Sequence, residues 1–149
     1  MAAIRWFTPF KRPVILLGIV IGGVSSALLA QQPSGAVGLT QENVVREALT
    51  EFPGTDALTF NGVFAPGGTS GKHRHPGTEV LHVIAGHGVL IQEGHEPVEL
   101  APGTTIVAEP EAKGGSFVHE LRNTSATEVL RTYVVLLVDK GEPPFFPVQ

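Results

Sequence analysis

Cysteine is absent from this chain of 149 residues, and the only methionine is Met1. The absence of cysteine excludes disulfide bonds and thiolate ligands, so a folded domain must be stabilised by its core, with or without a metal. Tryptophan and tyrosine occur once each, and charged residues make up only 16% of the chain. No internal repeat with a period of about 20 to 50 residues is visible, so we expect one domain rather than a tandem array.

The first 30 residues differ in composition from the rest of the chain. Three basic residues precede an apolar run from Val14 to Ala30, and two polar glutamines follow it. This order is typical of a secretory signal peptide, so we expect residues 1–30 to be removed near Ala30. The alternative is an uncleaved membrane anchor, which the run favours less because it has 17 residues, three of them glycine, where a spanning helix needs about 20 strongly apolar ones. We therefore expect a periplasmic or secreted protein, or a membrane-anchored one if cleavage does not occur.

Removal of the signal peptide would make the chain strongly acidic. Residues 1–30 contain three of the ten lysines and arginines and none of the 14 acidic residues, so the mature chain carries 7 basic against 14 acidic residues, a net charge of −7. No basic run remains, which argues against nucleic acid and against stable association with an anionic membrane after cleavage. Small molecules, metals and protein partners remain as ligands.

Glycine and proline are frequent, with 18 and 12 residues, and they divide the chain into short segments. Residues 31–39 have the composition of a flexible leader. Thr40 is placed to cap a short helix over residues 41–52, which ends before Pro53. We therefore expect a leader and short helix over 31–54, followed by the domain itself over 55–149.

The domain consists of short apolar segments separated by turn signals, a pattern typical of an antiparallel β sandwich or barrel. Its last segment is the longest and most apolar, as expected of a strand buried on both faces. The tail after it is too rich in proline for a β ladder, although Phe145 and Phe146 are expected to pack it onto the domain. The expected strands lie near residues 56–65, 79–85, 87–92, 96–101, 104–109, 115–123 and 127–138.

Four of the six histidines lie between residues 67 and 88, and two of these suggest a metal site. His73 and His75 are two residues apart, so on an extended strand both side chains leave the same face. Glu79 opens the next strand after a Pro-Gly turn and can point back toward them. Two imidazoles and a carboxylate suit a divalent transition metal, namely iron, manganese, copper, nickel or zinc, and His119 is the candidate for a fourth ligand. The alternative is a polar surface hairpin without a metal.

The other histidines are weaker candidates. His82 lies three residues after Glu79, so on a regular strand it faces the opposite side and is expected to serve packing or the surface. His87 and His95 each follow a glycine in a turn, where exposure to solvent is expected. We assign none of these three to a site.

The spacing of these residues resembles the first motif of the cupin superfamily at every defined position. The motif here consists of Gly67, five residues, His73, one residue, His75, three residues, Glu79, six residues and Gly86. A looser second motif contains Gly94, Pro102-Gly103, His119 and Asn123, with a longer loop before the histidine than the family usually has.

The resemblance implies a small all-β domain, a jelly roll of the cupin β-barrel type over about residues 55–138, preceded by the short helix. It also implies that His73, His75, Glu79 and His119 ligate a metal and leave one or two coordination positions free. Two copies are expected to pair through edge strands as a homodimer. Asn123 is expected to bond to nearby backbone rather than to a substrate.

Three functions fit a cupin with such a site. One is an oxygenase-like enzyme of the quercetin dioxygenase type, acting on a small organic molecule. Another is a non-oxidative isomerase or lyase in which the metal acts as a Lewis acid. The third is a non-catalytic module that binds a metal or small ligand. The lack of cysteine, and of methionine beyond Met1, slightly favours the oxygenase, because such a domain tolerates oxygen chemistry.

Overall fold

The computed structural model describes residues 35–109 and 118–148. The signal peptide expected over residues 1–30 and the start of the expected leader lie outside these residues. Within the described part of the chain every regular element is a β-strand. No helix there is long and apolar enough to cross a membrane.

Ten strands form the described structure, and all pairings between them are antiparallel. They are β1 (Val37–Ala48), β2 (Thr55–Thr69), β3 (His73–Arg74), β4 (Thr78–Ala85), β5 (Gly88–Gln92), β6 (Val98–Leu100), β7 (Thr105–Ala108), β8 (His119–Asn123), β9 (Leu130–Asp139) and β10 (Phe146–Pro147).

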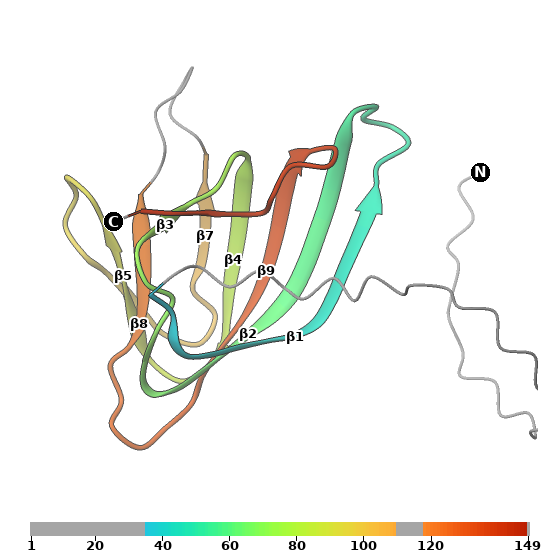
Figure 1. Cartoon of the computed structure of the whole chain (residues 1–149). Coiled ribbons are helices and arrows are strands. Elements are labelled where there is room, and N and C mark those ends of the chain that lie inside the picture. The colour runs from blue at the N-terminus through green and yellow to red at the C-terminus, as the bar shows by residue number, and fades with distance from the viewer. Residues whose placement is uncertain (1–34, 110–117, 149) are drawn as a thin grey trace, which may run out of the picture.

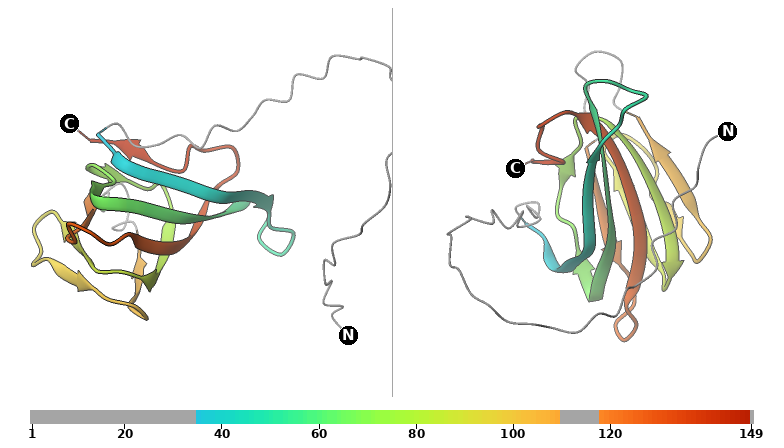
Figure 2. Two further views of the ribbon diagram at one scale, coloured as in Figure 1. Left: turned by 90° about the horizontal axis from the view of Figure 1, so that it is seen from below. Right: turned by 90° about the vertical axis from the view of Figure 1, so that its right-hand side faces the viewer.

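The strands make one strongly curled sheet that encloses an interior (Figure 1). Their hydrogen-bonded order is β10-β3-β8-β2-β9-β4-β7, with β1 beside β2 and with β5 between β6 and β8. The view along the curl shows β1, β2 and β9 on one side and β5 and β6 on the other (Figure 2). The prediction of an all-β domain is confirmed, and the curl places β3, β4 and β8 around a common interior.

The predicted helix over residues 41–52 is wrong, because most of this segment belongs to strand β1. It pairs with β2 along nearly its whole length, for example Arg46 with Leu58, and a bulge occurs where Asn43 takes a φ of 54°. An isolated helix of this length gains little stability in water. The long strand β2 offers a complete ladder instead, and pairing with it buries Leu39 in the core. Tertiary pairing therefore overrides the local preference for a helix.

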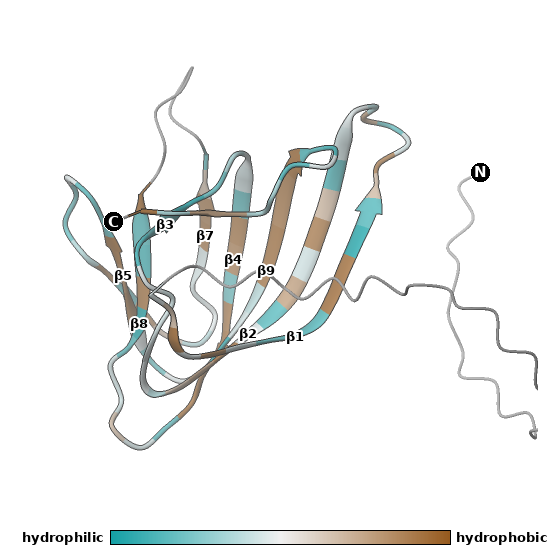
Figure 3. Ribbon diagram, viewed as in Figure 1, coloured by the Kyte–Doolittle hydropathy of each residue, from teal (hydrophilic) through white to brown (hydrophobic). Residues whose placement is uncertain are grey.

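Strand β9 alternates between core and surface, so the prediction that it is buried on both faces is wrong. Leu130, Thr132, Val134, Leu136 and Val138 point inward, and the residues between them are exposed or half-buried. The apolar colour continues along much of β9 (Figure 3), because two of its outward residues, Val135 and Leu137, are also apolar. The inward residues of β9 join leucines, valines and phenylalanines of β2, β4, β5 and β8 in one core.

The C-terminal tail closes one side of the site region. Phe145 is buried, as expected, and the next two residues form β10, which pairs Phe146 with Arg74 and Pro147 with His73. The expectation that proline keeps this tail out of a ladder is therefore wrong for these two residues. The ladder is short and lies at the end of the sheet order, where proline is tolerated.

Candidate metal centre

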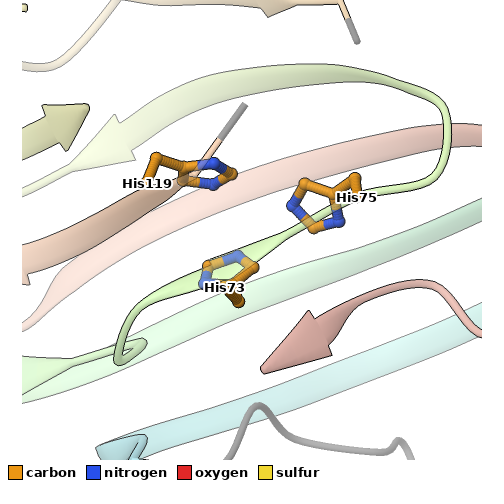
Figure 4. A group of neighbouring side chains, drawn as sticks. All are labelled: His73, His75 and His119. Carbon is orange, nitrogen blue, oxygen red and sulfur yellow. The ribbon is translucent and has the colours of Figure 1, made fainter. Parts of the chain in front are cut away.

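Three histidines from two parts of the chain meet inside the curled sheet (Figure 4). His73 lies on β3 and pairs with His119, the first residue of β8, while His75 lies just beyond β3. Each ring offers a nitrogen, and these three nitrogens lie within 4.8 Å of one another. All three side chains are buried, with His119 only 1% exposed.

The Glu79 carboxylate lies beside two of these rings. Its Oε2 atom is 3.4 Å from His119 Nε2 and 3.6 Å from His75 Nε2. Two ligands of one metal ion, each bonded at about 2.1 Å, are separated by roughly 3.0 to 3.4 Å in tetrahedral or octahedral geometry. The carboxylate therefore stands close to the position of a neighbouring ligand. His73, His75, Glu79 and His119, which the sequence singles out, are thus brought together.

Backbone carbonyls hold two of the rings in one orientation. His73 Nδ1 lies 2.9 Å from the Gly71 carbonyl, and His75 Nδ1 lies 2.7 Å from the Pro144 carbonyl. Because a carbonyl oxygen can only accept, each Nδ1 carries the proton and each Nε2 presents a lone pair. His75 Nε2 is buried and has no hydrogen-bond partner within the described residues. Such an orientation is the one that a metal ligand requires.

Burial shifts the pKa values of His73, His75 and Glu79, and the shifts of the two histidines favour metal binding. Desolvation lowers the pKa of His73 to about 4, assisted by the neighbouring His75. Desolvation also lowers the pKa of His75 to about 4. Burial raises the pKa of Glu79 to about 7, although His73 opposes this shift. At neutral pH the imidazoles of His73 and His75 are therefore neutral, whereas Glu79 is partly protonated.

These residues fit a divalent transition metal. Three imidazoles and one carboxylate are nitrogen and oxygen donors of the kind that iron, manganese, nickel, copper and zinc accept. The buried lone pair of His75 supports this fit, because a buried polar atom without a partner costs free energy unless something binds it. The identity of the metal is not fixed by these donors.

The four residues form the polar end of a cavity whose remaining wall is mostly apolar, with Gln41, Ser70 and Thr132 as its other polar residues. The cavity has a volume of about 30 Å³. One water needs about 10 to 15 Å³, so the interior is narrow. Phe60, Leu81, Leu121, Val134 and Phe145 supply much of the apolar wall.

The remaining histidines behave as predicted. His82 lies on the outer face and its Nδ1 is 2.8 Å from the Thr105 hydroxyl. His87 and His95 are exposed in turns. None of the three lines the metal-site cavity.

The groups that orient the ligands belong to the backbone. The nearby acidic side chains are engaged elsewhere, because Glu109 is exposed and Glu120 is bonded to Thr69 and Arg122. The acceptors are the carbonyls of Gly71 and Pro144. Carbonyls occur at every residue, so no side-chain pattern could single these two out.

Asn123 serves the backbone, as predicted. Its side-chain amide nitrogen contacts the carbonyls of Phe64, Ala65 and Glu128 at 2.7 to 3.1 Å, and its amide oxygen accepts from the Ser125 backbone. It therefore fixes the turn between β8 and β9 against the end of β2.

The family assignment agrees with this geometry. The sequence profile described as "Cupin domain" matches residues 61–136, about half of the chain. The chain belongs to the cupin domain family. This assignment confirms the resemblance seen in the motif of His73, His75 and Glu79.

Solved structures of other cupins share the curled sheet. A cupin-2 domain from Rhodospirillum rubrum has a TM-score of 0.55 at 18% identity, covering 76% of this chain and 68% of that one. The DMSP lyase DddQ from Ruegeria pomeroyi has a TM-score of 0.51 at 18% identity, covering 72% and 52%. The polyketide cyclase RemF from Streptomyces resistomycificus has a TM-score of 0.50 at 18% identity, covering 72% and 81%. Such low identities establish the shared fold alone. No curated protein matches this cupin in sequence.

Proposed function

We propose that this cupin is an exported, metal-dependent enzyme of the oxygenase-like type that acts on a small organic molecule. In this proposal His73, His75, His119 and Glu79 hold a divalent transition metal. The observation that supports it most is the inward-facing lone pair of His75. That ring is neutral at pH 7, fixed by a backbone carbonyl, buried and without a hydrogen-bond partner within the described residues.

The protein's own residues would orient and shield the reaction. When bound, the metal supplies a Lewis acid and, if it is redox-active, a centre at which dioxygen and a substrate can react. The carbonyls of Gly71 and Pro144 hold the imidazoles of His73 and His75 in one orientation. The apolar wall limits access of water. Beyond Met1 the sequence has no cysteine or methionine that such chemistry would oxidise.

A non-oxidative isomerase or lyase is the second candidate. The narrow interior favours it, because such a cavity suits a slender aliphatic molecule better than a bulky flavonol-like one. Two cupins of similar fold are described as a DMSP lyase and a polyketide cyclase. A non-catalytic metal or ligand module is the remaining alternative.

The test begins with the metal content of protein purified from its own compartment. Iron, copper, manganese or nickel at one equivalent, with oxygen uptake on catechols or β-diketones, supports the oxygenase. Turnover of small acids without oxygen supports the isomerase or lyase. Stoichiometric zinc without turnover supports the non-catalytic module, and His75→Ala protein that retains the same metal content overturns the site itself.

Export and pairing complete the proposal. N-terminal sequencing of the mature protein is expected to begin near Gln31, and an intact Met1 in the membrane fraction would instead indicate an anchor. Light scattering is expected to give the mass of two copies, since both ends of the sheet order expose strand edges.

A further inference from the structure

The wall of the metal-site cavity contains a second polar group far from the metal ligands. Thr132, on β9, is only 1% exposed and lines the cavity. Its hydroxyl oxygen is buried and has no hydrogen-bond partner within the described residues. A buried hydroxyl without a partner destabilises a protein, and valine would fill the same space without that cost. The fold therefore gives no structural reason for a hydroxyl at this position, which points to a role in binding a ligand.

The strand register places this hydroxyl relative to the ligands. Across β4 and β9, Glu79 lies opposite Leu136 and Leu81 lies opposite Val134, while Val83 lies opposite Thr132. Along β9, Thr132 is thus two inward-facing residues away from Leu136, the residue opposite Glu79. At about 3.3 Å per residue, the two backbone levels are roughly 13 Å apart. An apolar belt that includes Phe60, Leu81 and Val134 separates them.

A glycine and then an amide follow on the two strands beyond the hydroxyl. On β2 the partner of Thr132 is Gly62, whose other neighbour is Gln41 on β1. A Cβ atom on Gly62 would lie 2.6 Å from the Thr132 hydroxyl oxygen and 3.2 Å from the Phe64 ring. Gly62 has an ordinary φ, so glycine serves space here and not backbone conformation. Gln41 is half-buried and lines the same cavity.

We propose that Thr132, with Gln41 two strands away, binds the far end of the molecule held at the metal. This inference rests on the proposed function, because it takes the ligands to be metallated. The cavity wall contributed by the described residues includes no lysine or arginine. The far end of such a molecule is therefore uncharged, and we take the molecule to be a small organic acid or carbonyl compound, because a divalent metal accepts an anionic or carbonyl oxygen. Its apolar body crosses the belt, and an uncharged hydroxyl or carbonyl group meets Thr132.

The test uses protein loaded with Co²⁺, whose visible absorption reports both metal binding and carboxylate binding. The probes are three pairs of acids that differ only by a terminal hydroxyl or methyl group: 3-hydroxypropanoate and butanoate, 4-hydroxybutanoate and pentanoate, and 5-hydroxypentanoate and hexanoate. For at least one pair the hydroxy acid is expected to bind about tenfold more tightly, as one hydrogen bond to a buried partner allows.

Variants of Thr132 separate this role from a structural one. Thr132→Val is expected to abolish the preference while leaving Co²⁺ affinity unchanged and raising the melting temperature. Thr132→Ser is the matched control and keeps the preference. Gly62→Ala is expected to weaken the preference for the hydroxy acids, because its added Cβ would lie 2.6 Å from the Thr132 hydroxyl oxygen and displace it.

Two different failures can be told apart. Wild-type protein that binds Co²⁺ but shows no preference in any pair overturns the role of Thr132, as does a Thr132→Val variant that retains the preference. Wild-type protein that binds no Co²⁺ overturns the proposed function, and this inference with it.

Discussion

Glu79 Oε2 lies 3.4 Å from His119 Nε2, although β4 and β8 are not hydrogen-bonded neighbours in the sheet. The contact forms across the interior because the sheet curls until the two strands face each other. The candidate metal centre therefore depends on the curvature of the whole sheet as well as on the local hairpin.

Alanine at His75 is expected to lower metal affinity by about 100-fold or more, since loss of a group that merely orients a ligand already costs 10- to 100-fold. The measurement is competition with a chromophoric chelator. His82→Ala is the matched control, because His82 lies on the outer face of β4 and bonds to Thr105. Equal losses in the two variants would contradict the assignment of His75.

Metal affinity is expected to fall below pH 7 because Glu79 must lose its proton. The folded, metal-free protein has a Glu79 pKa of about 7, above the ordinary value of 4.5. Protons therefore compete with the metal below pH 7, and the affinity should drop by about tenfold per pH unit well below that point. The imidazoles of His73 and His75, with pKa values of about 4, add no competition until the pH nears 4.

Glu79→Gln provides the control for this pH dependence. The amide cannot titrate, so metal affinity is expected to be weaker at pH 8 and nearly constant between pH 5 and 7. Isothermal titration in two buffers of different ionisation heat counts the protons released. Release of no proton by wild-type protein at pH 6 would contradict a carboxylate ligand.

Gly86→Ala is expected to lower the free energy of unfolding by about 2 to 4 kcal/mol. Gly86 has a φ of 81°, and an added Cβ would lie 2.3 Å from the Val129 carbonyl oxygen. Gly94→Ala is the matched control, because Gly94 has a φ of 76° but nothing lies within 4 Å of its added Cβ. Gly94→Ala should lower the free energy of unfolding only by the backbone strain, about 1 to 2 kcal/mol. Urea denaturation of both variants measures the difference.

Asn123→Ala is expected to destabilise the protein by about 2 to 4 kcal/mol without changing metal affinity. The substitution leaves the carbonyls of Phe64, Ala65 and Glu128 without the amide that contacts them. Thr124→Ala, at the neighbouring exposed position, should change stability by less than about 0.5 kcal/mol. A loss of metal affinity in stable Asn123→Ala protein would instead implicate Asn123 in the site.

The sequence contains enough information to predict most of the candidate site. His73, His75 and Glu79 are close in the chain, so strand periodicity and one turn suffice to bring them together. The exposure of His82 follows from the same periodicity. His119 is distant in sequence, and only its place in a family motif connects it to the other three; its pairing with His73 on β3 accounts for that motif physically.

The parts that could not be predicted depend on contacts between distant segments. Residues 41–52 have a helical local pattern, and only the availability of β2 as a partner makes most of them a strand. The Pro144 carbonyl reaches His75 because the C-terminal tail crosses the sheet. The role inferred for Thr132 depends on the register of three strands, which its own position in an apolar segment does not reveal.

The carbonyl of Pro144 that fixes His75 lies 69 residues after it in the chain. His75 therefore has no such acceptor until the segment around Pro144 has docked across the sheet, whereas the ladders of β9 with β2 and β4 can form without that segment. The orientation of this ring thus depends on docking of the C-terminal tail as well as on the curled sheet.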